Sequence, residues 1–586
     1  APAPAAGIAS RHRVPPSYHN PLVLRLPGRQ RAESCADPFA FHGRGRDRNW
    51  YLYCTSDALT STERDASGAL VIHNVPMFRS RDLTHWTYGG DALPAKPSWV
   101  APSGGLWAPD VVYHNGRYLL YYTASDTVLP GGGSAIGVAT SPGPLGPWTD
   151  TGRPAIAPED IPSAPGSRRW VFDPEVITAG GRSYIYYGSY FGGVSVRRLA
   201  ADGLTSDPSS ERQIAIDNRY EGTFILRHGG WYYFMGSATN CCNGPLTGYA
   251  VFTARSRSPL GPFRDRDGVS ILNSRVGGTP VLTQNGNRWV GTGHNAVVTD
   301  YSGQDWIVYH AVDRTDPYYA GTVTYTKRPA LIDPLDWRHG WPTVRGGRGP
   351  SDQPMPGPAA QPGQRTAYRP HFEPALRPGR PVAARSDTFN GSTLSRQWTW
   401  VRQPDASTVR VAGGQLRWQT QAADLHPPDN SSASVLTEPA PRGDYVVETK
   451  VAVNVPAEGC CYNYVQGGLV IYGGDDNYVK LASVSIWNTR QSEFGKQAPA
   501  AAPGYPTYGN TVVGPVGAWT YLRIARQHGR TEDRYTAYTS LDGRHWDKGG
   551  TWTMTAGSAT KIGLISMGGA GFTSRFDYVR VSALAG

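Results

Sequence analysis

The 586-residue sequence lacks the features that mark several protein classes. No apolar run approaches the roughly 20 residues that a membrane-spanning helix needs. The basic residues form no block, and only 7 of the 57 are Lys. A nucleic-acid groove requires clustered basic side chains, so the net charge of +11 indicates a solvated, Arg-rich surface instead. We therefore expect neither a membrane nor a nucleic acid as partner.

Cysteine is scarce as well, with six residues in the whole chain. The Cys-x-x-Cys spacing typical of structural zinc is absent, and an even number fits disulfides formed in an oxidising compartment. Cys35 and Cys54 are candidates for one bridge, whereas Cys241-Cys242 and Cys460-Cys461 are each either a vicinal disulfide or bonded elsewhere. The first residues, Ala-Pro-Ala-Pro-Ala-Ala, resemble an end left by processing, so we expect a secreted, extracellular protein.

Glycine, proline and aromatic residues are abundant, with 70 Gly, 49 Pro, 18 Trp, 33 Tyr and 14 Phe. Long runs of helical period are scarce, which predicts an all-β protein with many turns. Aromatic-rich segments of strand type recur at residues 50–53, 118–122, 184–187, 231–234 and 306–309. Five such units, at roughly 60 residues each, predict a five-bladed β-propeller over residues 33–345, preceded by an N-terminal segment over 1–32.

The rest of the chain divides into two further regions. Residues 346–385 are rich in Pro, Gly and Arg and predict a linker or wrapping segment. Residues 386–586 carry short alternating strands separated by turns, which predict a second, β-sandwich domain of jelly-roll type.

Four acidic residues and one histidine recur at blade-like intervals, each in a short motif. They are Asp37 in Ala-Asp-Pro-Phe, Asp110 in Trp-Ala-Pro-Asp, Asp173 in Phe-Asp-Pro-Glu, Glu221 in Glu-Gly-Thr-Phe and His294 in Gly-Thr-Gly-His-Asn. Propeller blades run their inner strands toward a shared axis, so one residue from each can reach a common pocket. Inverting glycoside hydrolysis needs an acid, a base and a gap of roughly 6.5–9.5 Å for water between them. A third carboxylate can raise the pKa of the acid.

With these motifs in order, the region from residue 33 to about 345 resembles glycoside hydrolase family 43, whose members include arabinanases, α-L-arabinofuranosidases and β-xylosidases. The resemblance implies a five-bladed propeller and inversion at the anomeric centre. It further implies that Asp37 is the general base, Glu221 the general acid, and Asp173 the residue that orients the acid and tunes its pKa. Asp110 is expected to support the wall of the substrate-binding pocket.

The resemblance also suggests further site residues. The resemblance places His294 near the propeller axis, where it is expected to help hold a central ion, such as structural Ca²⁺, through water; no cofactor is otherwise expected. Calcium prefers oxygen ligands, so His294 would be a weak direct ligand. Trp107, Phe172 and Phe224, together with Trp170, adjoin the acidic motifs, and one or two of them are expected to stack on the sugar. Blade packing is the alternative for each, and Trp107 is the preferred candidate.

The segment that begins at Asp387-Thr388-Phe389 resembles the concanavalin-like sandwich appended to β-xylosidases and arabinofuranosidases of the same family. It either packs beside the propeller and shapes the pocket mouth, which favours release of single sugars from chain ends, or acts as a separate carbohydrate-binding module.

Together these features predict a secreted, inverting glycoside hydrolase that acts on arabinose- or xylose-containing polysaccharides or oligosaccharides. Exo-acting removal of α-L-arabinofuranose is the leading hypothesis. β-Xylosidase and endo-arabinanase activities are rivals within the same family, since fold does not fix substrate. A non-catalytic carbohydrate-binding propeller would tolerate loss of a carboxylate that this chain retains, and a structural or adhesive protein would leave the ordered acidic set unexplained.

Overall fold

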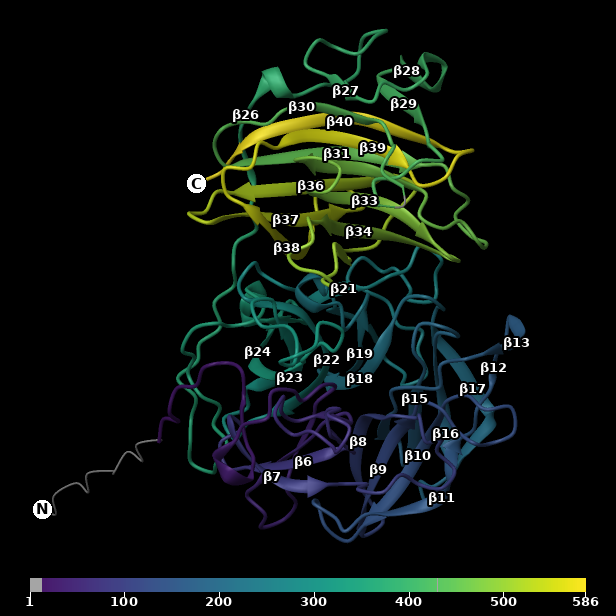
Figure 1. The fold of residues 1–586 in the computed structure, drawn as a ribbon, viewed down its shortest axis with the longest axis vertical. Helices are drawn as coiled ribbons and strands as arrows, with labels where there is room; N and C mark the ends of the chain where they lie inside the picture. The colour runs from purple at the N-terminus through teal and green to yellow at the C-terminus, as the bar shows by residue number, and fades with distance from the viewer. Residues whose placement is uncertain (1–12, 429) are drawn as a thin grey trace, which may run out of the picture.

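The computed structural model describes residues 13–428 and 430–586, which form two stacked all-β bodies (Figure 1). The proposed processed end at residues 1–6 lies outside these ranges. In the described part of the chain, no helix has the length and apolar character needed to cross a membrane.

Residues 23–344 form five antiparallel sheets, which are the blades of the predicted propeller. Blade 1 contains β2 (Phe39–His42), β3 (Trp50–Tyr53), β6 (Pro76–Ser80) and β7 (His85–Asp91), and β1 (Val23–Arg25) adds in parallel to β7. Blade 2 contains β8 (Leu106–His114), β9 (Arg117–Ala124), β10 (Ala135–Ser141) and β11 (Thr149–Ile156). Blade 3 contains β14 (Glu175–Ala179), β15 (Arg182–Tyr187), β16 (Val194–Leu199) and β17 (Ser206–Ala215).

Blade 4 contains β18 (Glu221–His228), β19 (Trp231–Ala238), β20 (Ala250–Ser256) and β21 (Thr279–Leu282). Blade 5 contains β22 (Trp289–Thr299), β23 (Asp305–Asp313), β24 (Ala330–Arg338) and β25 (Trp341–Val344). Two short hairpins project from the blades, β4 (Asp57–Ala58) with β5 (Ile72–His73) and β12 (Asp160–Ile161) with β13 (Ala164–Arg168). Within the described residues, helix is limited to 3-10 turns: η1 (Pro27–Arg29), η2 (Gly244–Leu246), η3 (Arg345–Gly347), η4 (Ala383–Arg385) and η5 (Ala406–Thr408).

The first strand of each sheet lies innermost, because β2, β8, β14, β18 and β22 contact one another around the axis. The aromatic strands predicted from the sequence are the second strands, and their side chains fill the cores between neighbouring blades. Tyr121 and Tyr187, for example, are fully buried between blades 2 and 3. Burial of such large rings removes much apolar surface from water and so stabilises the contact between neighbouring blades.

The ring closes through segments outside the blades. The backbone N–H of Leu22 donates to the carbonyl of Ala330 in blade 5, while β1 just after it pairs with blade 1. The region expected as linker or wrapping segment lies against the propeller, with Ala359 and Ala360 buried on its surface. The indole N–H of Trp50 donates to the Ala360 carbonyl at 2.9 Å. Residues 346–368 therefore wrap blades 1 and 5.

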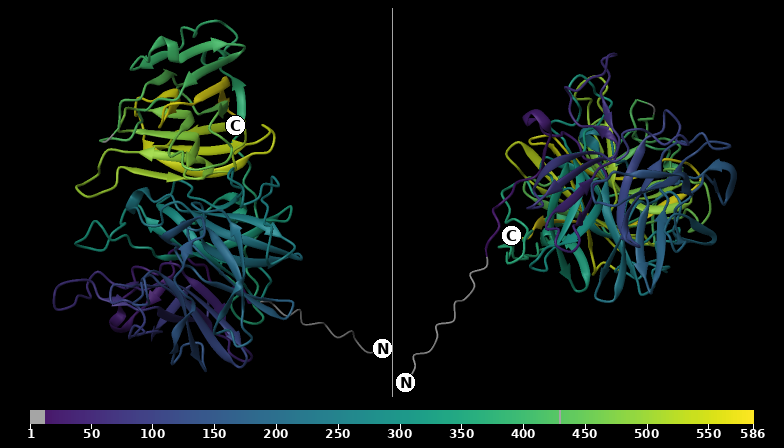
Figure 2. Two further views of the ribbon diagram at one scale, coloured as in Figure 1. Left: turned by 90° about the vertical axis from the view of Figure 1, so that its right-hand side faces the viewer. Right: turned by 90° about the horizontal axis from the view of Figure 1, so that it is seen from below.

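The C-terminal body is a sandwich of two sheets (Figure 2). One sheet contains β26 (Pro378–Pro381), β28 (Val409–Ala412), β29 (Gln415–Gln419), β31 (Tyr445–Val453), β36 (Thr520–Gln527), β37 (Glu532–Ser540), β38 (Asp547–Thr555) and β40 (Thr573–Leu584). The other contains β27 (Thr399–Val401), β30 (Val435–Pro439), β32 (Gln466–Tyr472), β33 (Tyr478–Ile486), β34 (Thr489–Gln497), β35 (Tyr508–Thr511) and β39 (Lys561–Met567). Side chains from both sheets form one core.

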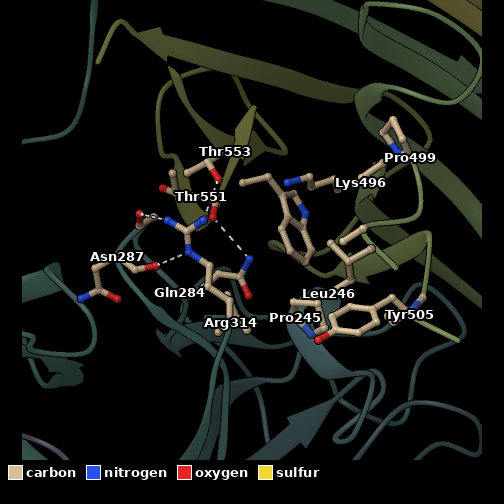
Figure 3. Close-up of a pocket in the computed structure, with 16 residues that line it drawn as sticks. Pro245, Leu246, Gln284, Asn287, Arg314, Lys496, Pro499, Tyr505, Thr551 and Thr553 are labelled. Atoms are coloured by element: carbon tan, nitrogen blue, oxygen red, sulfur yellow. Dashed lines mark hydrogen bonds between the residues drawn. The ribbon is translucent and has the colours of Figure 1, made fainter. Parts of the chain in front are cut away.

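The sandwich sits directly on blade 4 and blade 5. A Cβ on Gly248 would lie 1.7 Å from the carbonyl oxygen of Asn510, so the two backbones meet where no larger residue fits. Arg314 pairs with Glu532 across the same interface, with Nη2 2.6 Å from Oε2. A cavity of about 180 Å³ remains between the bodies, lined by Leu246 and Lys496 among others (Figure 3). It contains none of the predicted catalytic residues.

Candidate active site

The inner strands of the five blades share one local conformation at the pocket. In each, a residue of positive φ stands two positions before a residue that pairs with the second strand of the same blade. These five equivalent residues are Asp37, Ala108, Asp173, Gly222 and His294, with φ of 50°, 49°, 58°, 62° and 48°. Such bulges re-aim side chains at the end of a strand. Three of the five predicted residues, Asp37, Asp173 and His294, thus occupy equivalent positions, and Glu221 precedes its blade's position by one.

A second repeated element fixes these bulges. At four blade junctions the backbone N–H of the positive-φ residue donates to a side chain on the preceding blade, at 2.8–3.1 Å. The acceptors are Thr55 Oγ1 for Ala108, Thr123 Oγ1 for Asp173, Ser237 Oγ for His294 and His310 Nδ1 for Asp37. The corresponding position in blade 3 is Gly188, which has no side chain. There the N–H of Gly222 donates to Asp173 Oδ2 instead, at 2.9 Å.

Asp37 lies in a cluster of cationic and hydrogen-bonding groups. Its Oδ1 is 3.1 Å from His294 Nδ1 and 3.2 Å from Arg328 Nη1. Thr55 donates its hydroxyl to Oδ2 at 2.6 Å. Burial alone would disfavour the charged form, but the cations of His294 and Arg328 hold the pKa of Asp37 well below its usual range. Asp37 is therefore an ionised carboxylate.

The two histidines near Asp37 are in different protonation states. The carboxylate of Asp37 outweighs the effect of burial and raises the pKa of His294 to about 9, so this ring is cationic near neutral pH. His310 is fully buried, and burial lowers its pKa to about 4. Its Nδ1 accepts the Asp37 N–H, which leaves the proton on Nε2. The positive charge of His294 thus stabilises the ionised form of Asp37, whereas His310 fixes the backbone of Asp37 through a hydrogen bond.

Glu221, the first residue of β18, has the opposite electrostatic bias. Burial raises its pKa, and the negative charge of Asp37 adds to the rise. Tyr249 donates its hydroxyl to Oε1 at 2.7 Å, and Ser189 donates to Oε2 at 2.8 Å. These two hydrogen bonds favour the ionised form and limit the rise. Glu221 is thereby fixed in orientation, with a pKa between that of a free carboxyl and that of an unpaired buried one.

Asp173 is close enough to both Glu221 and Asp37 for their charges to affect it. Burial, with the charges of Glu221 and Asp37, raises the pKa of Asp173 to about 7 against the cation of His294. Its Oδ2 holds the backbone N–H of Gly222, next to Glu221. A Cβ on Gly222 would come within 3.1 Å of the His294 ring, and the left-handed φ also favours glycine. The Glu-Gly sequence therefore allows Glu221, Asp173 and His294 to converge.

Two predicted pocket residues follow the bulges by two positions and lie deeper. Asp110 is 1% exposed, accepts the N–H of Val176 at 2.5 Å and lies beside buried Glu175. Burial raises the pKa of Asp110 to about 8. Phe224 occupies the equivalent position of blade 4 and packs against the core between blades 4 and 5. Asp110 thus supports the blades, whereas Phe224 is half-buried and keeps part of its ring accessible.

The remaining aromatic candidates form a cluster at the rim. Trp107 contacts Phe172 edge to face with ring centroids 5.4 Å apart, and Trp170 stacks on the same Phe172 at 5.3 Å. Phe191 contacts Trp170 at 4.6 Å. Trp170 is 38% exposed, whereas Trp107 and Phe172 are half-buried. The rim therefore offers exposed ring surface mainly at Trp170, and Trp107 supports the cluster from within.

An ion near His294 would find few protein ligands. In residues 13–428 and 430–586, no group of three or more His, Cys, Asp and Glu side chains is arranged to hold a metal. His294 Nδ1 is engaged with Asp37, and calcium prefers six to eight oxygen ligands. The side chains here do not fit direct calcium coordination.

Sequence reasoning alone missed Thr55, Ser189, Tyr249, His310 and Arg328, which all contact the catalytic carboxylates. A signal exists for Thr55 and His310, because each follows the end of an aromatic sequence segment by one to three residues, as Thr123 and Ser237 do. Tyr249 and Arg328 lie on connections between the second and third strands of blades 4 and 5, whose course no local pattern specifies.

A propeller whose axis carries one carboxyl with a lowered pKa and another with a raised pKa has the site of a glycoside hydrolase. The model of glycosyl hydrolases family 43 matches residues 31–342, and that of the β-xylosidase C-terminal concanavalin A-like domain matches residues 386–573. The chain belongs to glycoside hydrolase family 43.

Several named proteins are similar to this chain. The chain is 31% identical over 323 residues to the extracellular exo-α-(1→5)-L-arabinofuranosidase ArbA of Cellvibrio japonicus, covering 50% of this chain and 82% of the relative. It is 34% identical over 273 residues to a probable arabinan endo-1,5-α-L-arabinosidase A of Aspergillus fumigatus, covering 44% and 79%. Among solved structures, an α-L-arabinanase of Cellvibrio cellulosa aligns at 27% identity with a TM-score of 0.43, covering 53% and 95%.

Proposed function

We propose that this protein is a secreted, inverting α-L-arabinofuranosidase that releases single arabinose units from the ends of arabinan-type chains. The observation that carries the proposal is the opposite bias of the two carboxyls: the pKa of Asp37 is lowered and that of Glu221 is raised. The names of the relatives, which act on α-1,5-linked arabinan or its ends, support arabinose over xylose as the sugar released.

In the proposed reaction, ionised Asp37 accepts a proton from water as that water attacks the anomeric carbon. Glu221 donates its proton to the glycosidic oxygen as the bond to the leaving group breaks. Asp173 holds the backbone beside Glu221 and, when ionised, favours the protonated form of the acid. His294 and Arg328 keep Asp37 ionised at acidic pH, at which Glu221 is protonated.

The position of the sandwich supports exo action. Asn218 and Arg219, just before Glu221, hydrogen-bond Asn488 Oδ1 at 2.8 Å and Gln491 Oε1 at 2.7 Å. Tyr190, which contacts the rim cluster through Phe191, has its pKa raised to about 12 by burial and by Tyr464 of the sandwich. The sandwich thus blocks the side of the pocket next to the acid, and a long chain would have to enter from one end.

We also propose that the protein is secreted. The extracellular relatives and three disulfides, Cys35–Cys54, Cys241–Cys242 and Cys460–Cys461, support secretion. A central ion near His294, calcium included, would have to be held largely through water.

Wild-type and Glu221→Gln enzyme on a panel of substrates would test the function. Aryl arabinofuranoside, xyloside and galactoside, linear arabinan and arabinoxylan should be hydrolysed by wild type only where arabinofuranose is terminal, with arabinose as the sole early product. Glu221→Gln should lose at least about 10²-fold of the rate on arabinan but less on an aryl substrate whose leaving group needs little protonation. Oligosaccharides as first products would identify an endo-arabinanase, and preference for the xyloside a β-xylosidase. Full rate in Glu221→Gln would contradict the catalytic assignment.

A contact variant tests the exo argument separately. Gln491→Ala removes the sandwich side chain that binds Arg219 without touching the carboxylates. It should raise the share of di- and trisaccharide products from arabinan while leaving the rate on a short aryl arabinofuranoside near the wild-type value. An unchanged product pattern would contradict the role of the sandwich at the pocket.

A further inference from the structure

The loop that joins β19 to β20, residues 239–249, is fixed at both ends to the catalytic centre. Two residues before it, Ser237 Oγ accepts the backbone N–H of His294 at 2.9 Å. At its end, Tyr249 donates to Glu221 Oε1 at 2.7 Å. The residues between these two points include the disulfide of adjacent Cys241 and Cys242.

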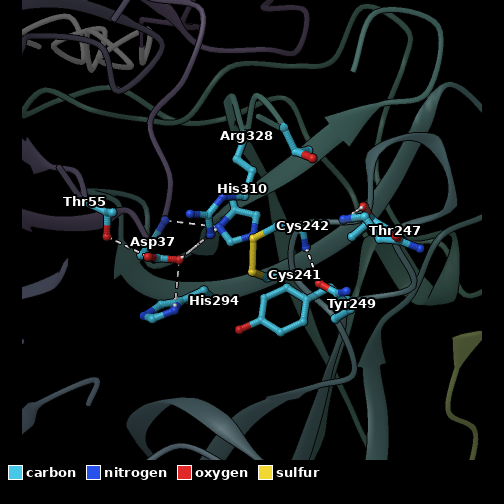
Figure 4. Close-up of a disulfide and its surroundings, with 12 residues drawn as sticks. Asp37, Thr55, Cys241, Cys242, Thr247, Tyr249, His294, His310 and Arg328 are labelled. Carbon is cyan, nitrogen blue, oxygen red and sulfur yellow. Dashed lines mark hydrogen bonds and ion pairs between the residues drawn. A yellow bond between two sulfur atoms is a disulfide. The ribbon is translucent and has the colours of Figure 1, made fainter. Parts of the chain in front are cut away.

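The disulfide faces the pocket side of the loop. The side chains around it include Asp37, His294, His310 and Tyr249 (Figure 4). Cys241 is half-buried and Cys242 is exposed, although free cysteine and its disulfides are among the most buried groups in proteins. The sulfurs are therefore not part of a blade core.

Contacts with both bodies hold the loop in one position. The N–H of Cys242 donates to Asn240 Oδ1 at 2.8 Å, and Asn243 Nδ2 donates to the carbonyl of Tyr508 in the sandwich at 2.8 Å. The N–H of Gly244 donates to Thr326 Oγ1 at 3.1 Å. The sulfur pair thus lies on a fixed support, as a binding surface requires.

We propose that the Cys241–Cys242 disulfide forms an apolar wall of the sugar pocket and packs its two sulfurs against a C–H face of the pentose. The groups that converge on Asp37 and Glu221 are charged or hydrogen-bonding, so they can serve the hydroxyls but not the apolar face of the ring. Sulfur is apolar and polarisable and packs well against irregular surfaces. This inference rests on the proposed function, because the ring it contacts is the sugar released by the enzyme.

Protection from reduction tests the contact directly in the wild-type enzyme. The folded protein is treated with a water-soluble phosphine and iodoacetamide, with or without a saturating concentration of the monosaccharide that the wild-type enzyme releases. Alkylation of each cysteine pair is followed by peptide mass spectrometry. The sugar should slow alkylation of Cys241 and Cys242 severalfold and leave Cys460 and Cys461, the second adjacent pair, unchanged. Equal rates with and without sugar at Cys241–Cys242, or equal protection of both pairs, would overturn the proposal.

The double variant Cys241→Ser/Cys242→Ser gives a kinetic readout. Removing roughly 50 Å² of apolar contact corresponds to about a tenfold rise in KM, and we expect kcat to change less than about threefold. A loop that serves only to support Tyr249 would instead lower kcat and shift the pH profile, which would overturn the proposal. If the variant does not fold, the protection experiment decides alone. Failure of wild type to hydrolyse any pentoside would instead refute the proposed function.

Discussion

Asp173 Oδ2 accepts the backbone N–H of Gly222 at 2.9 Å, at the one blade junction whose usual acceptor position is a glycine, Gly188. At the other four junctions a threonine, serine or histidine of the preceding blade does this work. The three carboxyls predicted to be catalytic therefore include a departure from the repeat, because Asp173, a group that can carry charge, makes a hydrogen bond that an uncharged side chain makes at the other junctions.

This double role separates two substitutions at the same residue. Asp173→Asn keeps an oxygen that can accept from Gly222 but removes the negative charge, so the pKa of Glu221 should fall and the alkaline limb of kcat/KM should move to lower pH. Asp173→Ala should show the same shift and lose roughly a further tenfold in kcat, because the Gly222 N–H is left unpaired. Full pH profiles of both variants check this, and identical kcat values for the two would contradict the backbone role.

Tyr249→Phe should move the alkaline limb of the kcat/KM profile to higher pH. The Tyr249 hydroxyl donates to Glu221 and lowers its pKa, so its removal raises the pKa and keeps the acid protonated to higher pH. The expected result is an alkaline limb displaced upward, with a fall in kcat of a few fold as Glu221 loses one support. Tyr121→Phe is the matched control, because the Tyr121 hydroxyl bonds Gly203, away from the pocket. A limb that moves downward in Tyr249→Phe would contradict the argument.

His294→Gln should affect the acidic limb. The pKa of Asp37 is held low by the cations of His294 and Arg328, and activity requires Asp37 to be ionised. A neutral Gln retains a hydrogen-bond donor but no charge, so the pKa of Asp37 should rise by about one unit or more. The acidic limb of kcat/KM should then move to higher pH, while thermal stability at neutral pH distinguishes this from unfolding. A limb at its wild-type position would show that Arg328 alone suffices.

Gly188→Ala should destabilise the propeller. Gly188 has φ of 120°, and a Cβ there would lie 2.1 Å from the carbonyl oxygen of Gly193. We expect a loss of about 2–4 kcal/mol in the free energy of unfolding. Gly180→Ala is the control, because Gly180 also has a positive φ, 56°, but open space around its Cβ; it should lose only about 1 kcal/mol. Denaturant unfolding of both variants measures the difference, and equal losses would contradict the steric argument.

The sequence predicted the five blades because each repeats an aromatic second strand and a polar motif before the first. It also placed Asp37, Asp173, Glu221 and His294 at one pocket, which the structure brings together around Asp37. It left open whether Phe224 stacks on sugar or packs in a blade, because a bulge decides how far a side chain beside it turns inward; in the structure Phe224 lies half-buried against a blade core. Nor did it settle the pairing of Cys241 and Cys242, which depends on where their loop is held.

Asp37, the proposed base, also lies where the first and last blades meet. Asp37 belongs to the first blade and His310, which fixes its backbone, to the last, so the two meet only after the chain has travelled the full circle. In a molecule whose ring has not closed, Asp37 lacks the hydrogen bond from its backbone N–H to His310. If Asp37 is the base, activity therefore requires a fully folded propeller, because the site is completed only where the first and last blades join.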